Sequence, residues 1–196
     1  MTFEPNRQPK AAHIWTKHPG GFYTEPSWCS ERLFDAEPFV RTVMDPAAGS
    51  GRIPIAAAAY GYEVVTSDIV DRGFLLDAIG DFLTSTHHVA NIVSNPPFPI
   101  LREFTLHALT VARRKVALLW PLRRLPAARW LEATPLRRIH LLTPRPSLPP
   151  GDLIAAGMKP GNGSQDFCWL VFERGYIGNP ETLWLHRDGG ACHAQG

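Results

Sequence analysis

Short apolar runs alternate with helical patterns between residues 41 and 173, and this alternation restricts the possible folds more than any other feature of the chain. The apolar runs predict strands at Arg41–Asp45, Tyr62–Ser67, Val89–Ser94, Val116–Trp120, Arg138–Leu142 and Phe167–Glu173, with a weaker strand or helix end near Ala78–Leu83. The intervening segments predict helices at Ser27–Phe34, Gly51–Tyr60, Ile100–Arg113 and Ala127–Ala133. Strands that alternate with helices form a parallel sheet with helices on both faces, so the expected fold class is α/β.

The length of 196 residues suits one domain with its own core. We expect a single domain over residues 13–186, a flexible arm at 1–12 and a flexible tail at 187–196. The Pro- and Gly-rich stretch Thr143–Gln165 is expected to be a long functional loop, because compact domains rarely keep such lengths idle. No stretch approaches the roughly 20 apolar residues that span a bilayer, so we expect a cytoplasmic protein without membrane contact.

The chain has no pattern of metal ligands or disulfides. Cys29, Cys168 and Cys192 are far apart and form no CxxC pair. The adjacent residues His87 and His88 cannot easily face one ion from neighbouring positions of a strand or loop. We therefore expect neither a metal site nor a disulfide framework.

A glycine-rich turn, Asp45-Pro46-Ala47-Ala48-Gly49-Ser50-Gly51, connects the first predicted strand to the next helix. Doubly wound sheets bind ligands at this position, and glycines let the backbone approach a nucleoside closely. The turn matches neither GxGxxG nor a P-loop. Asp68, which ends the second strand, can accept hydrogen bonds from both ribose hydroxyls, and Asp45 can attract an ammonium group. The motif indicates a nucleoside joined to an amino acid; alternatively, the glycines only form a tight turn and Asp68 caps it.

The tetrad Asn95-Pro96-Pro97-Phe98 follows a five-residue apolar run, and its prolines indicate a rigid loop at the carboxyl end of a strand. An amine conjugated to an aromatic base, or an amide nitrogen, is a poor nucleophile because its lone pair is delocalised. The side-chain oxygen of Asn95 and the carbonyl of Pro96 can accept the two N–H bonds, and Phe98 can stack on the planar acceptor. We therefore predict that the four residues Asn95, Pro96, Pro97 and Phe98 are catalytic; the alternative is an ordinary Asn-Pro turn.

Basic residues are concentrated in one part of the chain. Between Leu101 and Arg145 there are ten Lys or Arg and two acidic residues, although the net charge of the chain is only +2. Such a block is typical of a surface that binds a polyanion, and solvated helix ends are the alternative explanation. Within it, Arg123 and Arg124 are candidates for binding substrate phosphates.

The glycine-rich turn and the tetrad together resemble the class I S-adenosylmethionine-dependent amino-methyltransferases, most closely the bacterial and phage N6-adenine DNA methyltransferases. The resemblance covers roughly residues 22–173. It implies a Rossmann-like class I methyltransferase fold, with a mostly parallel sheet and an antiparallel last strand, and S-adenosylmethionine as the cofactor. The cofactor contacts that it implies are Tyr23, Thr24, Asp45, Pro46, Ala47, Gly49, Gly51, Asp68, Ile69, Asp81, Phe82 and Asn95.

The resemblance also assigns roles to individual residues. Asp68 would hold the ribose, Ile69 would pack on the cofactor adenine, and Asp81 would contact that adenine together with Phe82. Tyr23 and Thr24 lie in a segment similar to one that closes over the methionine end. The candidates for contact with the acceptor are Phe98, Asp166, Phe167, Arg123 and Arg124.

Adenine in DNA is the acceptor that these motifs favour. The tetrad also resembles that of RNA base-amine methyltransferases acting on N2 of guanine or N6 of adenine, and a protein glutamine side chain is a third acceptor. A catalytically silent nucleic-acid-binding module is the non-enzymatic alternative. No segment has room for an added recognition domain, so the choice of target would fall to the 143–165 loop, the basic residues or a partner.

Overall fold

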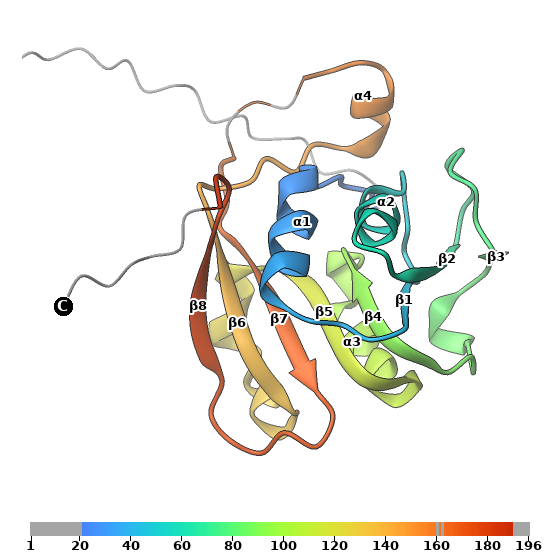
Figure 1. Ribbon diagram of the computed structural model, residues 1–196. Coiled ribbons are helices and arrows are strands. Elements are labelled where there is room, and N and C mark those ends of the chain that lie inside the picture. Colours follow the sequence, from blue (N-terminus) through green and yellow to red (C-terminus); the bar gives the residue numbers. More distant parts are fainter. Residues whose placement is uncertain (1–20, 160, 162, 190–196) are drawn as a thin grey trace, which may run out of the picture.

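The computed structural model describes residues 21–159, 161 and 163–189. The predicted arm at 1–12 and positions 190–196 of the predicted tail lie outside this range. One eight-stranded sheet forms the centre of the molecule, in the order β3-β2-β1-β4-β5-β7-β6-β8 (Figure 1). The strands are β1 (Thr42–Asp45), β2 (Glu63–Asp68), β3 (Ala78–Ile79), β4 (Val89–Ser94), β5 (Ala112–Pro121), β6 (Leu136–Thr143), β7 (Phe167–Glu173) and β8 (Glu181–His186).

Strand β7 is antiparallel to both of its neighbours, β5 and β6, and the other pairs in the sheet are parallel. This arrangement confirms the predicted α/β fold with a mostly parallel sheet and an antiparallel strand at 167–173. The weak signal near 78–83 corresponds to β3 and the short 3-10 helix η1 (Phe82–Thr84).

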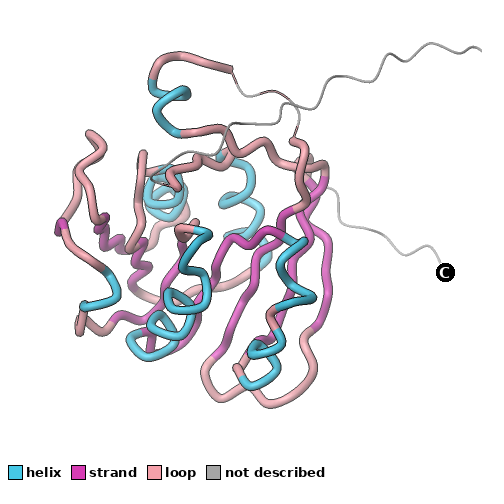
Figure 2. The backbone as a smooth tube through the Cα atoms, turned by 180° about the vertical axis from the view of Figure 1, so that it is seen from behind, coloured by secondary structure: helices cyan, strands magenta, loops and turns pink. Residues whose placement is uncertain are grey.

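Helices cover both faces of the sheet. The α-helices are α1 (Ser27–Ala36), α2 (Arg52–Ala59), α3 (Leu101–Val111) and α4 (Gly151–Ala155), and the remaining 3-10 helices are η2 (Phe98–Ile100), η3 (Leu122–Ala127) and η4 (Arg129–Ala133). Helices α1 and α2 pack on one face, whereas α3 and η4 pack on the other, as the two opposite views show (Figures 1 and 2).

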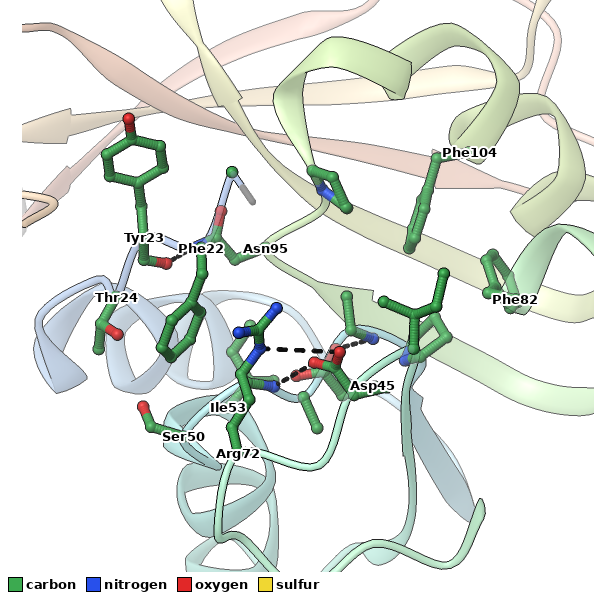
Figure 3. A pocket seen from close by; sticks show the side chains of 18 of the residues that line it. Phe22, Tyr23, Thr24, Asp45, Ser50, Ile53, Arg72, Phe82, Asn95 and Phe104 are labelled. Atoms are coloured by element: carbon green, nitrogen blue, oxygen red, sulfur yellow. Dashed lines mark hydrogen bonds and ion pairs between the residues drawn. The ribbon is translucent and has the colours of Figure 1, made fainter. Parts of the chain in front are cut away.

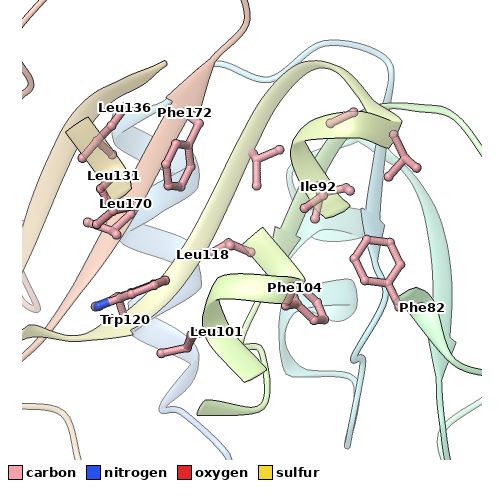
Figure 4. Close-up of a cluster of buried hydrophobic side chains, with 14 of the residues drawn as sticks. Phe82, Ile92, Leu101, Phe104, Leu118, Trp120, Leu131, Leu136, Leu170 and Phe172 are labelled. Atoms are coloured by element: carbon pink, nitrogen blue, oxygen red, sulfur yellow. The ribbon is translucent and has the colours of Figure 1, made fainter. Parts of the chain in front are cut away.

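The alternation of side chains along the strands divides the core in two. On β5, Leu118 and Trp120 join the cluster that contains Phe104 of α3 (Figure 4). The intervening Ala117 and Leu119 belong to the opposite cluster, with α1 and α2. Both faces of β5 are thus buried from Val116 onward, which explains the continuous apolar sequence from Val116 to Pro121.

Three predictions from the sequence differ from the structure. The helix predicted at 127–133 is found as the short 3-10 helix η4, which begins at Arg129; the preceding 3-10 helix η3 contains Pro126, and proline cannot donate a backbone hydrogen bond. Arg113 belongs to β5 rather than to the preceding helix, since the chain is already extended at Ala112, which pairs with Val89. Strand β8 was not predicted, because it pairs only with β6 at the sheet edge and most of its side chains are exposed.

Strand order determines where a ligand can bind. From β1 the chain continues to β2 on one side, and β4 later pairs with β1 on the other side. Open α/β sheets bind ligands beside the carboxyl ends of strands at such a switch point. Asp45, Asp68 and Ser94 are the last residues of β1, β2 and β4, so they lie at this edge.

Candidate functional site

A pocket lies over the carboxyl ends of β1 and β2 (Figure 3). Eleven of the twelve residues expected to contact a cofactor line it: Tyr23, Thr24, Asp45, Pro46, Ala47, Gly49, Asp68, Ile69, Asp81, Phe82 and Asn95. The twelfth, Gly51, lies directly before α2. Five segments that are distant in the sequence therefore meet at one pocket.

The glycine-rich turn needs its glycines for two reasons. Gly49 and Gly51 have positive φ angles of 54° and 80°, which residues with a side chain rarely adopt. In addition, a Cβ on Gly49 would lie 2.8 Å from the ring of Phe22, and one on Gly51 would lie 2.2 Å from the ring of Phe74. The turn is thus compact and closely covered by two aromatic rings.

Asp68 fixes this turn to the end of β2. Its buried carboxylate accepts hydrogen bonds from the backbone N–H of Gly49 (2.9 Å) and of Val70 (3.1 Å). Arg72 Nε lies 3.8 Å from the same carboxylate, and the Arg72 guanidinium stacks 4.2 Å above the ring of Phe22. Each carboxylate oxygen has a second lone pair, so Asp68 can still accept hydrogen bonds from a diol.

Asp45 is a buried carboxyl at the base of the pocket. It accepts hydrogen bonds from Ser94 Oγ (2.7 Å) and from the N–H of Ala47 (3.1 Å). Burial raises the pKa of Asp45 to about 8, and the nearby carboxylates of Glu25 and Asp68 add to this effect. A cation bound beside it would favour the ionised form.

Thr24 lines the pocket and carries a buried hydroxyl. Its side chain is buried, and its Oγ1 has no hydrogen-bond partner within the described part of the chain. A buried hydroxyl is rarely left without a partner, so a ligand that carries an acceptor suits this position. The backbone of Thr24 is held in place, because its N–H donates to the carbonyl of Pro149 (3.0 Å).

The side chain of Asn95 has a defined orientation. Its Nδ2 donates to the backbone carbonyl of Tyr23 (2.9 Å) and to Oε2 of Glu25 (2.7 Å). Both of these oxygens are acceptors, so the amino side of the amide must face them and Oδ1 must point away. Among the described residues, none donates a hydrogen bond to this oxygen.

Aromatic rings surround Phe98 next to Asn95. The ring of Tyr23 lies nearly parallel to that of Phe98, with centroids 6.3 Å apart and planes inclined by 6°. Phe167, at the start of β7, is buried, and its ring centroid lies 5.9 Å from that of Phe98. Arg124 donates a hydrogen bond to the carbonyl of Phe98. Arg124 is therefore adjacent to the tetrad, and its neighbour Arg123 is exposed.

Other candidate residues lie apart from the pocket. Asp166 forms an exposed ion pair with Arg145 (Oδ1 to Nε, 2.6 Å) and does not line the pocket. The basic residues do not form one surface: Arg113 and Arg114 are near the start of β5, whereas Arg123 follows its end. At about 3.3 Å per residue, a ten-residue strand separates the two groups by roughly 30 Å.

Glu25 is a site residue that the sequence analysis missed. It is buried, lines the pocket and contacts Asn95 from a position 70 residues away in the sequence. Burial raises the pKa of Glu25, and hydrogen bonds from its own backbone and from Asn95 oppose this shift. Its position beside Thr24, as an acid within an aromatic stretch, was the available signal.

Two findings concern metals and membranes. In the described part of the chain, no three His, Cys, Asp or Glu side chains are grouped so that they could hold a metal ion. None of the described helices is both long and apolar enough to cross a membrane.

No protein-family model matches the chain, and no curated protein matches it. Solved structures do share its fold. A protein from Pyrococcus horikoshii named as a predicted RNA methyltransferase superposes with a TM-score of 0.55 at 19% identity, over 76% of this chain and 81% of that one. A predicted O-methyltransferase from Agrobacterium tumefaciens gives a TM-score of 0.56 at 14% identity, over 82% and 85%. Magnesium protoporphyrin IX methyltransferase from Synechocystis, with bound S-adenosylmethionine, gives 0.50 at 13% identity, over 76% of each chain. The chain therefore has the Rossmann-like fold of class I methyltransferases.

Proposed function

We propose that this protein is an S-adenosylmethionine-dependent methyltransferase that modifies an amino nitrogen, with N6 of adenine in DNA as the preferred acceptor. The orientation of Asn95 carries this proposal. Its Oδ1 is an acceptor to which no residue in the described part of the chain donates, and Asn95 lines a pocket suited to a nucleoside joined to an amino acid. A protein that only bound a nucleotide would not need a hydrogen-bond acceptor beside the ring of Phe98.

The polar groups of the pocket match those of S-adenosylmethionine. Asp68 would hold the ribose hydroxyls, and Asp45 lies where a positive group would stabilise its ionised form. The unused Thr24 hydroxyl suits the carboxylate of the cofactor, and Ile69 and Phe82 would contact its adenine. When bound, the cofactor supplies a methyl group on a positively charged sulfur, which makes that methyl group electrophilic.

Asn95 would activate the acceptor nitrogen. By accepting one N–H bond at Oδ1, with the carbonyl of Pro96 accepting the other, it would hold the nitrogen in a pyramidal geometry and free its lone pair. Phe98, with Tyr23 and Phe167 beside it, would fix the plane of the base. No base is required before attack, since the alkylated nitrogen is acidic enough to lose its proton to solvent.

The positive charge near the tetrad favours a nucleic acid as the methyl acceptor. Arg123 is exposed and Arg124 contacts the tetrad, so both can approach phosphates near a base at Phe98. A duplex adenine would have to leave the stack to reach Asn95, at a cost of a few kcal/mol. The fold alone does not select the acceptor, since one solved structure of this fold is named for RNA and another for oxygen methylation.

The test is transfer of labelled methyl from S-adenosylmethionine to unmethylated DNA, total RNA and a protein extract in parallel, followed by nucleoside and amino-acid analysis. We expect N6-methyladenine in DNA. Label found only in RNA or protein would support the same chemistry on a different methyl acceptor. The test variant is Asn95→Ala, which should abolish transfer while the protein still binds the cofactor; equal loss of both would contradict the role given to Asn95. No label in any acceptor, with intact cofactor binding, would refute the proposal.

A further inference from the structure

The amide of Asn95 is useful to an amino acceptor in only one orientation. Rotation by 180° about the last side-chain bond exchanges Oδ1 and Nδ2, and this torsion has only a broad preference of its own. The reversed amide would point N–H groups at the acceptor amine, which also presents N–H groups. Something other than Asn95 itself must therefore fix which atom faces the pocket.

Two oxygens meet the Nδ2 side of the amide. One is the backbone carbonyl of Tyr23, at 2.9 Å, and the other is Oε2 of Glu25, at 2.7 Å. A reversed amide would place Oδ1 against both of these acceptors, so two hydrogen bonds would be replaced by two repulsive contacts. The observed contacts use both hydrogens of Nδ2.

Glu25 is itself held rigidly. Its side chain is only 4% exposed. The preceding residues pair with the segment after β6: Tyr23 forms a β-bridge with Pro150, and Thr24 N–H donates to Pro149 (3.0 Å). Helix α1 begins two residues later. Contacts on both sides thus hold the backbone at Glu25, so its carboxylate has a defined position beside Asn95.

We infer that Glu25 is a positioning residue, which holds the amide of Asn95 so that Oδ1 faces the acceptor amine. This inference rests on the proposed function for the role of Asn95. Glu25 does not contact the acceptor and affects the methyl-transfer step only through Asn95. The Tyr23 carbonyl and the Glu25 carboxylate together form a clamp on the Asn95 amide. Because the carbonyl belongs to the backbone, only the Glu25 carboxylate can be removed by substitution.

The kinetic test compares Glu25→Ala with Glu25→Gln. Loss of the clamp should lower kcat about 100-fold in Glu25→Ala, because small misplacements of a catalytic group have effects of this size. Glutamine keeps an acceptor oxygen at the same reach, so Glu25→Gln should stay within about tenfold of the wild type. Glu132→Ala, on the exposed surface of η4, is the control for removal of an acid. A loss of cofactor affinity with unchanged kcat at saturating cofactor would overturn the inference.

A double-mutant cycle separates positioning from a general structural effect. Glu25→Ala should cause almost no further loss when Asn95 is already alanine, because its effect passes through that side chain. Single-turnover transfer of labelled methyl measures the low residual rates of both variants. The same 100-fold loss in the Asn95→Ala background would contradict the inference.

A third measurement does not depend on the acceptor. The side-chain 1H–15N signals of Asn95, assigned by their absence in Asn95→Ala, should show slow hydrogen exchange in the wild type. In Glu25→Ala these signals should shift and exchange faster, and in Glu25→Gln they should be largely restored. Unchanged signals in Glu25→Ala would overturn the inference. If the wild type methylates no acceptor, the proposed function fails, and the exchange measurement still decides whether Glu25 holds Asn95.

Discussion

Removing the charge of Glu37 should destabilise the protein strongly, because this carboxylate is the centre of a buried ionic cluster. Glu37 follows α1 and is completely buried. It lies 2.8 Å from Lys115 Nζ, 3.0 Å from Arg138 and 2.9 Å from His140 Nε2. The cluster joins the end of α1 to strands β5 and β6.

The pKa of Glu37 gives the size of the effect. Burial alone would raise this pKa, but hydrogen bonds from His140 and Lys115, with the charges of Lys115 and Arg138, lower it from 4.5 to about 2. Lowering the pKa of Glu37 from 4.5 to about 2 corresponds to about 3 kcal/mol of stability at neutral pH. Breaking a buried ion pair from one side typically costs 3–5 kcal/mol, which agrees with this value.

The sign of the pH dependence follows from the lowered pKa. The stabilisation is fully present above the unfolded-state pKa of 4.5 and is lost as the pH falls from there towards 2. Glu37→Gln should therefore lose about 3 kcal/mol of unfolding free energy at pH 7, and the difference from the wild type should shrink below pH 4.5. Urea unfolding at several pH values measures both quantities.

The matched control is an acid two residues earlier, within α1. Asp35 pairs with Arg32, but its side chain is 45% exposed, so Asp35→Asn should change the free energy of unfolding by less than about 1 kcal/mol. A loss below 1 kcal/mol in Glu37→Gln, or an equal loss at pH 7 and pH 4, would refute the assignment of Glu37 as the stabilising anion.

Three further predictions concern the pocket. Asp68→Ala should weaken S-adenosylmethionine binding about tenfold by calorimetry, whereas Asp71→Ala, an exposed acid nearby, should not; unchanged affinity in Asp68→Ala would exclude the ribose role. In the absence of ligand, Asp45 has a pKa of about 8, and a cationic ligand favours its ionised form. The affinity of the wild type for S-adenosylmethionine should therefore rise relative to that of Asp45→Asn between pH 6 and pH 8. Parallel pH profiles of the two affinities would contradict this. Gly51→Ala should destabilise the fold more than Gly61→Ala in urea unfolding, because both glycines have φ near +80° but only Gly51 faces a ring, at 2.2 Å; equal losses would mean that Phe74 moves freely.

The sequence predicted the parts of the site that depend on local pattern. Asp45, Asp68 and Asn95 each come directly after or at the end of an apolar run, and parallel strands place such ends at one edge of a sheet. The positive φ angles of Gly49 and Gly51 explain why glycine occurs there. Each of these features can be recognised from the few residues around it in the sequence.

The parts that the sequence did not predict depend on distant pairs. Glu25 meets Asn95 across 70 positions, and Glu37 meets His140 across 103. Nothing in the local pattern distinguishes either acid from a solvated one. Arg124 donates to the carbonyl of Phe98, a contact that could not be predicted without the path of the chain after β5.

The two ends of the sheet use buried acids in opposite ways. At the amino end of β5, Glu37 is neutralised by cations of the protein itself, so its charge stabilises the fold. At the carboxyl edge, Glu25 and Asp45 are buried with raised pKa values and with hydrogen bonds that only partly offset burial. A cationic cofactor would favour the ionised forms of these acids, and by binding the folded state it would stabilise the protein. Ion pairs within the protein thus stabilise the Glu37 end of the sheet, whereas the acids at the pocket can gain a counter-charge from a ligand.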